Sequence, residues 1–420
     1  MKKQFLLSII LIGMFATSRS QSITELGFFT PLISTFDMKY SNNHLIISQQ
    51  GMKIFDVTNP ANPQQVGSAT YPGSYAYQLA VNGNYAYMGE GGSGYFSVYS
   101  ISNFNSPTLT GSTIIPSTAF VTGGDLIVTN NTAYMTGADS LYVVDVSNLA
   151  SPALITSLQA IDLPPFGVAS SVAVDGNTLF VLHSLGITAY DISNPSAPIA
   201  LDTIPLSHAY HTGLAVDTIG HRLFSPWLTA LQTHLGFDAY DISSPSSPSL
   251  LFSDSIVFGS GEFGVTDYYN NLLVISQGGG VTMWDVSSST HGFLTSFTGQ
   301  NVPNSTVSIE FRDSVFYNSR RGGFEILRYN GGFPTAINET GITHDDFTIY
   351  PNPVTNKYLN LRENLKNSSI QISNIEGKIV WEEKNINSKT IALDNLQSGL
   401  YFIHITTDKS IITKKFIFSE

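Results

Sequence analysis

Short runs of alternating apolar and polar residues, separated by Gly, Asn and Pro, fill most of the chain between residues 36 and 330. Residues 78–81, 85–88 and 141–146 are typical runs, and turns or corners rich in Gly, Asn, Ser and Pro separate them. Alternation with a period of two residues indicates half-buried strands, and no stretch sustains the period of a helix. The pattern therefore predicts an all-β chain.

One phrase recurs seven times within this pattern, and each copy ends at a corner. The equivalent corner positions lie 43–50 residues apart; they are Asp56, Ser100, Asp145, Asp191, Asp241, Asp285 and Arg328. A period near 45 residues with several short strands per period fits a propeller blade of four antiparallel strands. We therefore predict a seven-bladed β-propeller over residues 22–331.

The seventh copy stops after its third strand, so its fourth strand must come from elsewhere. Residues 26–34 (LGFFTPLIS) stand ahead of the first copy, where a fourth strand would be expected. Pairing this segment with the last blade leaves no unpaired edge at the junction. We expect the N-terminal strand to close the ring in this way.

The repeat disappears in the C-terminal part of the chain. Residues 332–345 are polar and Gly-rich, which is typical of a linker. Residues 346–420 are enough to fold independently, and we predict a small immunoglobulin-like β-sandwich there. Its expected strands are 358–361, 369–373, 378–381, 390–393, 401–405 and 411–418.

The first 20 residues have the layout of a secretory signal peptide. Lys2 and Lys3 precede a mostly apolar run at 5–15, and small residues flank Arg19. The run is shorter than the roughly 20 residues that a transmembrane helix needs. We therefore predict export with cleavage near Ser20, and we predict no transmembrane span.

Composition and charge exclude several classes of protein. The chain has no Cys, which rules out disulfides, thiolate metal sites and a Cys nucleophile. Residues 22–340 carry 7 basic and 22 acidic side chains, a balance of −15, whereas residues 341–420 carry 9 of each. A negative surface repels phosphate backbones, so we expect no nucleic-acid partner.

Five copies carry an Asp at the corner, followed by Ser or Thr: Asp56, Asp145, Asp191, Asp241 and Asp285. A short acceptor side chain at such a corner bonds backbone N–H groups. Because the Asp recurs from copy to copy, we interpret it as a turn cap rather than as a calcium ligand.

Residues that differ between the copies are better candidates for binding. We look for them in the loop that enters each inner strand and in the loop between the second and third strands. Both loop types are expected to open on the same face, around the central channel. The candidates are Glu90, Asp139, His183, His208, His211, Trp227, His234, Glu262, Arg320 and Arg321.

His208 and His211 stand at the start of the fifth inner strand, and imidazoles bind transition metals. Residues three apart on a strand point to opposite faces, so the rings converge only if the segment is a turn. No carboxylate has a fixed spacing to them. We therefore favour surface or hydrogen-bonded histidines, with a metal site at His208 and His211 as the alternative, and we expect no cofactor. No Ser-His-Asp, phosphate-loop or paired-carboxylate motif stands out.

The repeats resemble the LVIVD-repeat family. The copies NTAYMTGADSLYVVDVSNLASP, from Asn131, and NTLFVLHSLGITAYDISNPSAP, from Asn177, match its pattern best, whereas Ser100 and Arg328 depart from the corner Asp. The resemblance extends from Gly27 to about Gly332. It implies a β-propeller at an exported or surface location and implies no established reaction.

The tail resembles the type A C-terminal sorting domain of the type IX secretion system. The resemblance lies in YPNP, NIEGKIV, LQSGLYFIHI and KKF, and the motif residues are Tyr350, Pro351, Asn352, Pro353, Gly377, Lys378, Gly399, Tyr401, Lys414 and Lys415. It implies that the type IX machinery is a partner. It also implies delivery to the extracellular space or the outer-membrane surface of a Gram-negative bacterium.

These observations favour a non-enzymatic, adhesin-like module that binds an extracellular protein or glycan through the loops of one propeller face. The alternative is an extracellular hydrolase or lyase with its site at the channel mouth, using His208, His211 and His234.

Overall fold

The computed structural model divides into two compact units, Met1–Ile337 and Asn338–Glu420. It describes residues 21–419 except 33, 73–74, 90–93, 116–123, 138–139, 160–170, 209, 232, 258–264, 278, 288–290, 300, 303–305, 332, 334–348, 351–353, 356, 362–367, 375–378, 387–388, 394–395 and 407–410. The predicted signal peptide and most of the predicted linker lie outside the described residues. No helix among the described residues is long and apolar enough to cross a membrane.

Seven antiparallel sheets make up the described part of the first unit, and five of them take four consecutive strands. These five are β2 (Asp37–Ser41), β3 (His44–Ser48), β4 (Gly51–Asp56) and β5 (Gln64–Thr70); β6 (Gln78–Asn82), β7 (Tyr85–Gly89), β8 (Tyr95–Ser100) and β9 (Thr108–Ile114); β10 (Leu126–Thr129), β11 (Thr132–Thr136), β12 (Ser140–Asp145) and β13 (Ala153–Gln159); β14 (Val172–Asp175), β15 (Thr178–His183), β16 (Gly186–Asp191) and β17 (Ile199–Pro205); and β23 (Thr266–Tyr269), β24 (Leu272–Gln277), β25 (Gly280–Asp285) and β26 (Gly292–Thr298).

The other two sheets depart from this plan. The fifth sheet in chain order has five strands: β18 (Tyr210–His211), β19 (Ala215–Asp217), β20 (Arg222–Leu228), β21 (His234–Asp241) and β22 (Ser249–Val257). The last sheet combines β27 (Thr306–Arg312), β28 (Val315–Arg320) and β29 (Gly323–Tyr329) with β1 (Ile23–Phe29). The prediction of an all-β propeller is confirmed.

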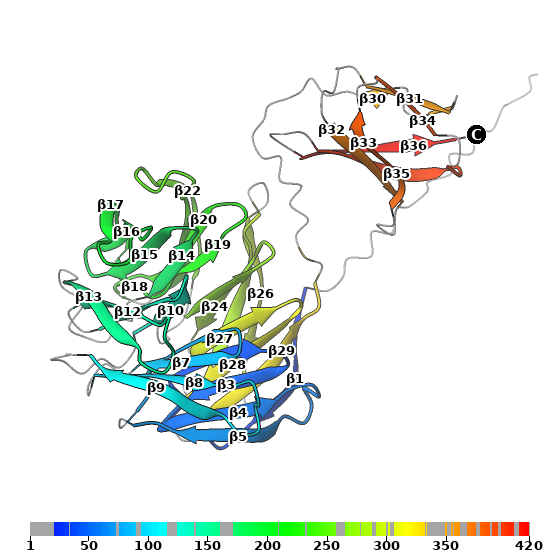
Figure 1. The fold of residues 1–420 in the computed structure, drawn as a ribbon. Coiled ribbons are helices and arrows are strands. Elements are labelled where there is room, and N and C mark those ends of the chain that lie inside the picture. The colour runs from blue at the N-terminus through cyan, green and yellow to red at the C-terminus, as the bar shows by residue number, and fades with distance from the viewer. Residues whose placement is uncertain are drawn as a thin grey trace, which may run out of the picture. The chain divides into compact units, whose positions relative to one another are not determined.

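The ring closes through the N-terminal strand. β1 pairs antiparallel with β29, and Figure 1 shows the blue β1 beside the yellow β29. The inner strands also contact one another in a complete circle, from β2 through β6, β10, β14, β19, β23 and β27 back to β2. The predicted closure is confirmed, but its boundaries were wrong, because β1 covers Ile23–Phe29 rather than residues 26–34. Pro31 lacks the N–H that a longer strand would need.

Tight turns join the first two strands of several sheets and use residues that tolerate positive φ. Asn42 and Asn43 have φ of 47° and 60°, and Asn270 and Asn271 have φ of 46° and 63°. Positive φ at both central residues gives a turn whose twist matches that of the flanking strands. The repeated Asn pairs therefore explain why these hairpins recur.

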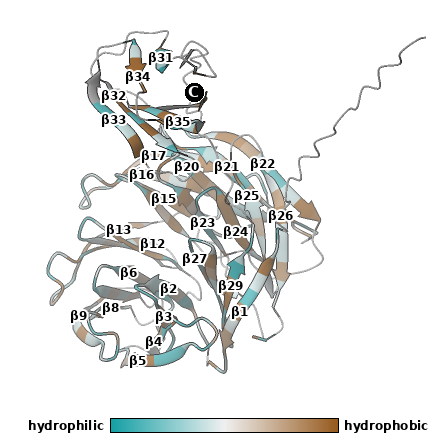
Figure 2. Ribbon diagram, turned by 90° about the vertical axis from the view of Figure 1, so that its right-hand side faces the viewer, coloured by the Kyte–Doolittle hydropathy of each residue, from teal (hydrophilic) through white to brown (hydrophobic). Residues whose placement is uncertain are grey.

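Apolar clusters lie between neighbouring sheets and hold them together. Leu32, Phe55 and Phe324 belong to a cluster that joins the last sheet to the first, and a comparable cluster joins the fifth and sixth sheets. Figure 2 shows the hydrophobic colour on strands such as β24, whereas the outer strand β5 is largely hydrophilic. Because each sheet buries both faces against its neighbours, one domain can span about 300 residues.

The corner aspartates act as caps, as predicted. The Asp145 carboxylate accepts the backbone N–H of Ser147 at 2.8 Å, and Asp56, Asp191, Asp241 and Asp285 do the same with the residue two positions on. The hydrogen bonds from Ser147 lower the pKa of Asp145 below its ordinary value. The ionised carboxylate therefore stabilises the corner.

We expect Asp145→Ala to lower the free energy of unfolding at neutral pH by about 1 kcal/mol, because the Ser147 N–H loses its acceptor. A folded-state pKa below the unfolded one gives stability that is present above about pH 4 and is lost as pH falls. Denaturant unfolding of both proteins at neutral pH and near pH 3 tests this. The difference between them should shrink in acid, and an equal difference at both pH values would contradict the capping role.

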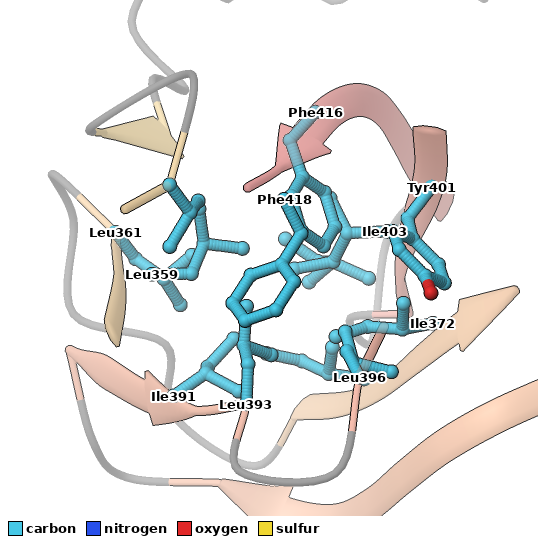
Figure 3. Close-up of a cluster of buried hydrophobic side chains, with 13 residues drawn as sticks. Leu359, Leu361, Ile372, Ile391, Leu393, Leu396, Tyr401, Ile403, Phe416 and Phe418 are labelled. Carbon is cyan, nitrogen blue, oxygen red and sulfur yellow. The ribbon is translucent and has the colours of Figure 1, made fainter. Parts of the chain in front are cut away.

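The second unit contains two sheets that share one core. β30 (Ile349–Tyr350), β31 (Tyr358–Leu361) and β34 (Thr390–Ala392) form one, and β33 (Ile379–Ile386), β32 (Ser368–Asn374), β35 (Gly399–Thr406) and β36 (Ile411–Phe418) form the other. Leu359, Ile391, Ile403 and Phe418 meet between them (Figure 3). The six predicted strands are present, and β30 is an addition. The immunoglobulin-like arrangement stays a prediction.

Candidate functional site

A central channel of about 770 Å³ runs between the inner strands. All seven sheets contribute to its wall, since the lining includes residues of β2, β6, β10, β14, β23 and β27 and the segment 212–214 that leads into β19. The polar residues in this wall are Ser34, Asp37, Lys39, Asp125, Ser171, Thr212, Thr266, Asp267, Thr306, Ser308, Glu310 and Arg321.

Three carboxylates in the channel wall connect neighbouring inner strands. Asp37 accepts the backbone N–H of Leu79 at 3.0 Å, so it links β2 to β6. Asp125 accepts the N–H of Val172 at 3.0 Å, and Asp267 accepts the N–H of Phe311 at 2.7 Å. Because each carboxylate satisfies a donor on the next sheet, these residues are part of the ring's framework.

Three charged side chains of the channel wall have pKa values shifted from their ordinary values. Burial raises the pKa of Asp37 to about 6. Burial and the nearby Glu310 raise the pKa of Asp267 to about 7. Burial opposes the charge on Lys39, but Asp37 and Glu310 outweigh it and raise the pKa of Lys39 above its ordinary value. The Lys39 ammonium lies 3.2 Å from Glu310, which keeps one cation among these carboxylates.

One channel mouth, where the inner strands begin, carries an aromatic group. Phe36 lies edge-on to Tyr77 and Tyr75, with ring centroids 4.5 and 5.7 Å apart. Phe36 and Tyr75 are half-buried, and Arg321 is exposed at the same mouth. The backbone N–H of Thr35 bonds the carbonyl of Arg321, so the loop that enters β2 lies beside the loop between β28 and β29 at this mouth.

A group of polar side chains gathers in the fifth sheet, next in the chain to the channel-lining residue Thr212. Ligating atoms of His208, His211 and Asp238 lie within 4.8 Å of one another. His208 lies in a bend ahead of β18 and stacks on Trp227, with ring centroids 3.5 Å apart. Because His208 lies in this bend rather than on the strand, its ring and that of His211 can converge. Burial lowers the pKa of His211 to about 4, although the nearby Asp238 opposes this shift.

Hydrogen bonds fix this histidine group in place. Asp238, 1% exposed, accepts Trp227 Nε1–H at 3.1 Å and the Tyr240 hydroxyl at 3.1 Å. Ser207 Oγ donates to the same carboxylate and lies 3.4 Å from His211 Nε2. The other ring nitrogen of His211 contacts Ser225 rather than Asp238, so these residues do not form a Ser-His-Asp triad.

The other predicted site residues are not brought together. Arg320 is buried in an ion pair with Glu325, and His183 contacts the Thr188 hydroxyl at 2.8 Å. Burial lowers the pKa of His183. His234 starts β21 and contacts Thr233. Glu90, Asp139 and Glu262 lie outside the described residues, as do the sorting-motif residues Pro351, Asn352, Pro353, Gly377 and Lys378.

The remaining sorting-motif residues lie on strands of the second unit. Tyr350 belongs to β30, Gly399 and Tyr401 to β35, and Lys414 and Lys415 to β36. Tyr401 is buried in the core, stacked against Phe416 with ring centroids 5.8 Å apart. This part of the motif therefore includes a packing residue.

Sequence reasoning missed several residues of these two sites. Asp37 and Asp125 occupy equivalent positions at the start of an inner strand, and comparing that position across the copies would have found them. Asp267 stands two residues beyond the equivalent position, Val265. Asp238 stands three residues before the corner Asp241, where the fourth and sixth copies carry Thr188 and Thr282, and this difference is visible in the sequence. Phe36 and Tyr75 gave no sequence signal, because aromatic residues fill the strands generally.

Comparison with known families supports this architecture. The LVIVD repeat model matches residues 73–114, 123–159, 166–203 and 236–254. The secretion system C-terminal sorting domain model matches residues 348–419. No curated protein sequence matches the chain.

Two solved structures show the same fold. The WD40 beta propeller domain of Doa1 is 11% identical at a TM-score of 0.55, with 73% of this chain and 96% of that chain covered. Sqt1 of Saccharomyces cerevisiae is 10% identical at a TM-score of 0.51, with 73% and 98% covered. At these identities the likeness concerns the fold alone.

The sorting domain implies secretion through the type IX system to the cell surface or the extracellular space, and it implies an interaction with that machinery. The chain is thus a β-propeller protein that carries LVIVD repeats and ends in a type IX secretion C-terminal sorting domain.

Proposed function

We propose that the propeller is an adhesin-like binding module that captures an extracellular protein or glycan at the aromatic mouth of its channel. The observation that carries this proposal is the combination of half-buried aromatic rings with an exposed guanidinium at one opening. Aromatic and Arg side chains are enriched at the centres of binding surfaces, and aromatic faces stack on sugars.

The channel carboxylates favour binding over hydrolysis. A general acid or base must reach the substrate proton, yet Asp37, Asp125 and Asp267 each accept backbone N–H groups of their own or a neighbouring strand. They hold the ring together, which leaves the mouth residues to contact a partner.

The test uses the purified full chain without residues 1–20, applied to arrays of immobilised polysaccharides and extracellular proteins. We expect a saturable signal for the unaltered protein and at least a tenfold weaker signal for the double variant Tyr75→Ala/Arg321→Glu, by analogy with hot-spot truncations worth 2 kcal/mol or more.

Leu109→Ala is the matched control, because Leu109 is 51% exposed on the outer strand β9, away from the inner strands. It should leave binding unchanged, and the thermal unfolding of all three proteins should coincide. No signal from the unaltered protein, or equal signals from the double variant and the unaltered protein, would refute the proposal.

A further inference from the structure

Two sheets bury a carboxylate at the same position of their third strand. Asp238 and Glu325 each stand three residues before the corner position, at Asp241 and Arg328. Asp238 is 1% exposed and Glu325 is 0% exposed. Carboxylates this deeply buried require a compensating cation or a full set of hydrogen bonds.

The last sheet supplies that cation from its second strand. Arg320 pairs in register with Gly323, two residues before Glu325, and its guanidinium lies 3.2 Å from the Glu325 carboxylate. In the fifth sheet the same register position belongs to Trp227, which pairs with Gly236, two residues before Asp238. Trp227 donates a hydrogen bond to Asp238 but carries no charge.

Two imidazoles lie near Asp238, which lacks, among the described residues, the cation that Arg320 provides for Glu325. Within the part of the chain that the structure describes, Asp238 makes no ion pair with Lys or Arg, and His208 and His211 face it instead. The Ser207 hydroxyl lies between these three side chains. It lies 2.7 Å from His208 Nδ1 and 3.4 Å from His211 Nε2, and it donates to Asp238 Oδ2. This oxygen therefore marks a point that all three ligating atoms can reach.

Outer contacts hold each ligating group in position. His211 Nδ1 contacts Ser225 Oγ at 2.8 Å, which leaves Nε2 directed at the shared point. Trp227 and Tyr240 fix the carboxylate, and the Trp227 ring supports His208. Ligands of bound metals characteristically have such second partners, which set their tautomer and orientation.

We propose that His208 Nδ1, His211 Nε2 and the Asp238 carboxylate bind one divalent transition-metal ion of the Zn²⁺ type. Two imidazoles and one carboxylate suit such ions, and three protein ligands leave a coordination position open. Ser207 is exposed, so its hydroxyl can turn away and the open position faces solvent. The ion supplies the charge that Arg320 supplies in the last sheet.

The test uses the full chain without residues 1–20, purified without a polyhistidine tag and dialysed against chelator. Calorimetric titration with Zn²⁺ is expected to show one site per chain, and Co²⁺ is expected to give visible absorption bands. His208→Ala and Asp238→Asn should each weaken Zn²⁺ binding at least about a hundredfold. Loss of a hydrogen-bond partner of a metal ligand weakens binding by up to about that factor, and loss of the ligand itself is expected to cost no less. Ser207→Ala should retain the site.

His183→Ala is the matched control, because His183 is a half-buried histidine of the fourth sheet. It should leave the affinity and the stoichiometry unchanged. His208 lies in a bend outside the strands, so its variant is expected to fold even if Asp238→Asn does not. A folded wild-type protein without saturable Zn²⁺ binding, or equal binding by wild type and His208→Ala, would overturn the proposal.

Discussion

Removing residues 22–34 is expected to prevent the propeller from folding to a stable ring. This segment contains β1, whose pairing with β29 extends from Ile23 to Phe29. Phe29 packs against Phe55 and Phe324, with ring centroids 4.6 and 5.8 Å apart, and Leu32 is 6% exposed in the same cluster. A fully buried side chain of this size contributes about 1.5–3 kcal/mol.

Leu32 is nearly fully buried and Ile23, Leu26 and Phe29 are half-buried, so together they approach the lower end of the roughly 5–15 kcal/mol that stabilises a typical domain. The deletion also leaves the edge of β29 unpaired, which invites aggregation. Calorimetry should show the cooperative transition lost or lowered by more than about 10 °C, since 1 kcal/mol shifts the Tm of a large domain by about 2–4 °C.

Peptide complementation provides the control for this deletion. A synthetic peptide of residues 22–34, added to the truncated protein during refolding, should restore the transition, whereas a scrambled peptide should not. An unchanged Tm in the truncated protein would mean that the ring does not depend on β1.

Replacing Arg222 is expected to have the second large effect. Its side chain is 8% exposed and lies 2.7 Å from the Asp217 carboxylate, whose own exposure is 6%. Arg222 also donates to Asn271 at 2.7 Å and to the Val286 carbonyl, so it connects the fifth and sixth sheets. Arg222→Met leaves Asp217 buried without its cation, which typically costs 3–5 kcal/mol.

Thermal and urea unfolding measure this loss, and the double variant Arg222→Met/Asp217→Asn should recover part of it by removing the unpaired charge. Arg312→Met is the control, because the Arg312 side chain is 45% exposed and Glu310 keeps its ion pair with Lys39 when Arg312 is replaced, so a smaller loss is expected. Similar losses from Arg222→Met and Arg312→Met would contradict the structural role of Arg222.

Local chemistry made most of the fold predictable from the sequence. The carboxylate of each corner Asp accepts the backbone N–H of the Ser or Thr two residues later. This local hydrogen bond recurs at the same position of the repeat, so the sequence alone indicates it. The missing fourth strand of the last copy likewise predicted the pairing of β1 with β29. The start of β1 was misplaced because the polar Ile23–Glu25 stretch gives little hydrophobic signal before the strand is paired.

The candidate sites were less predictable because they depend on contacts between distant residues. His208 and His211 were noticed, but Asp238 lies 27 residues beyond His211 and reaches them only because β20 pairs with both β18 and β21. Arg320 was taken as a candidate for binding, although the structure shows it buried against Glu325. Whether Arg320 is exposed or paired with Glu325 depends on the register in which β28 pairs with β29, and neither residue indicates that register by itself.

The β1–β29 pairing also sets the order of events in biogenesis. β1 is among the first segments of the propeller to emerge during synthesis, yet its partner emerges about 300 residues later. Until then β1 has no partner strand, and the domain cannot complete its cooperative structure. The sorting domain begins at residue 348, soon after β29 ends at Tyr329. The segment that matches the sorting domain thus follows β29, the last strand that the ring needs, along the chain.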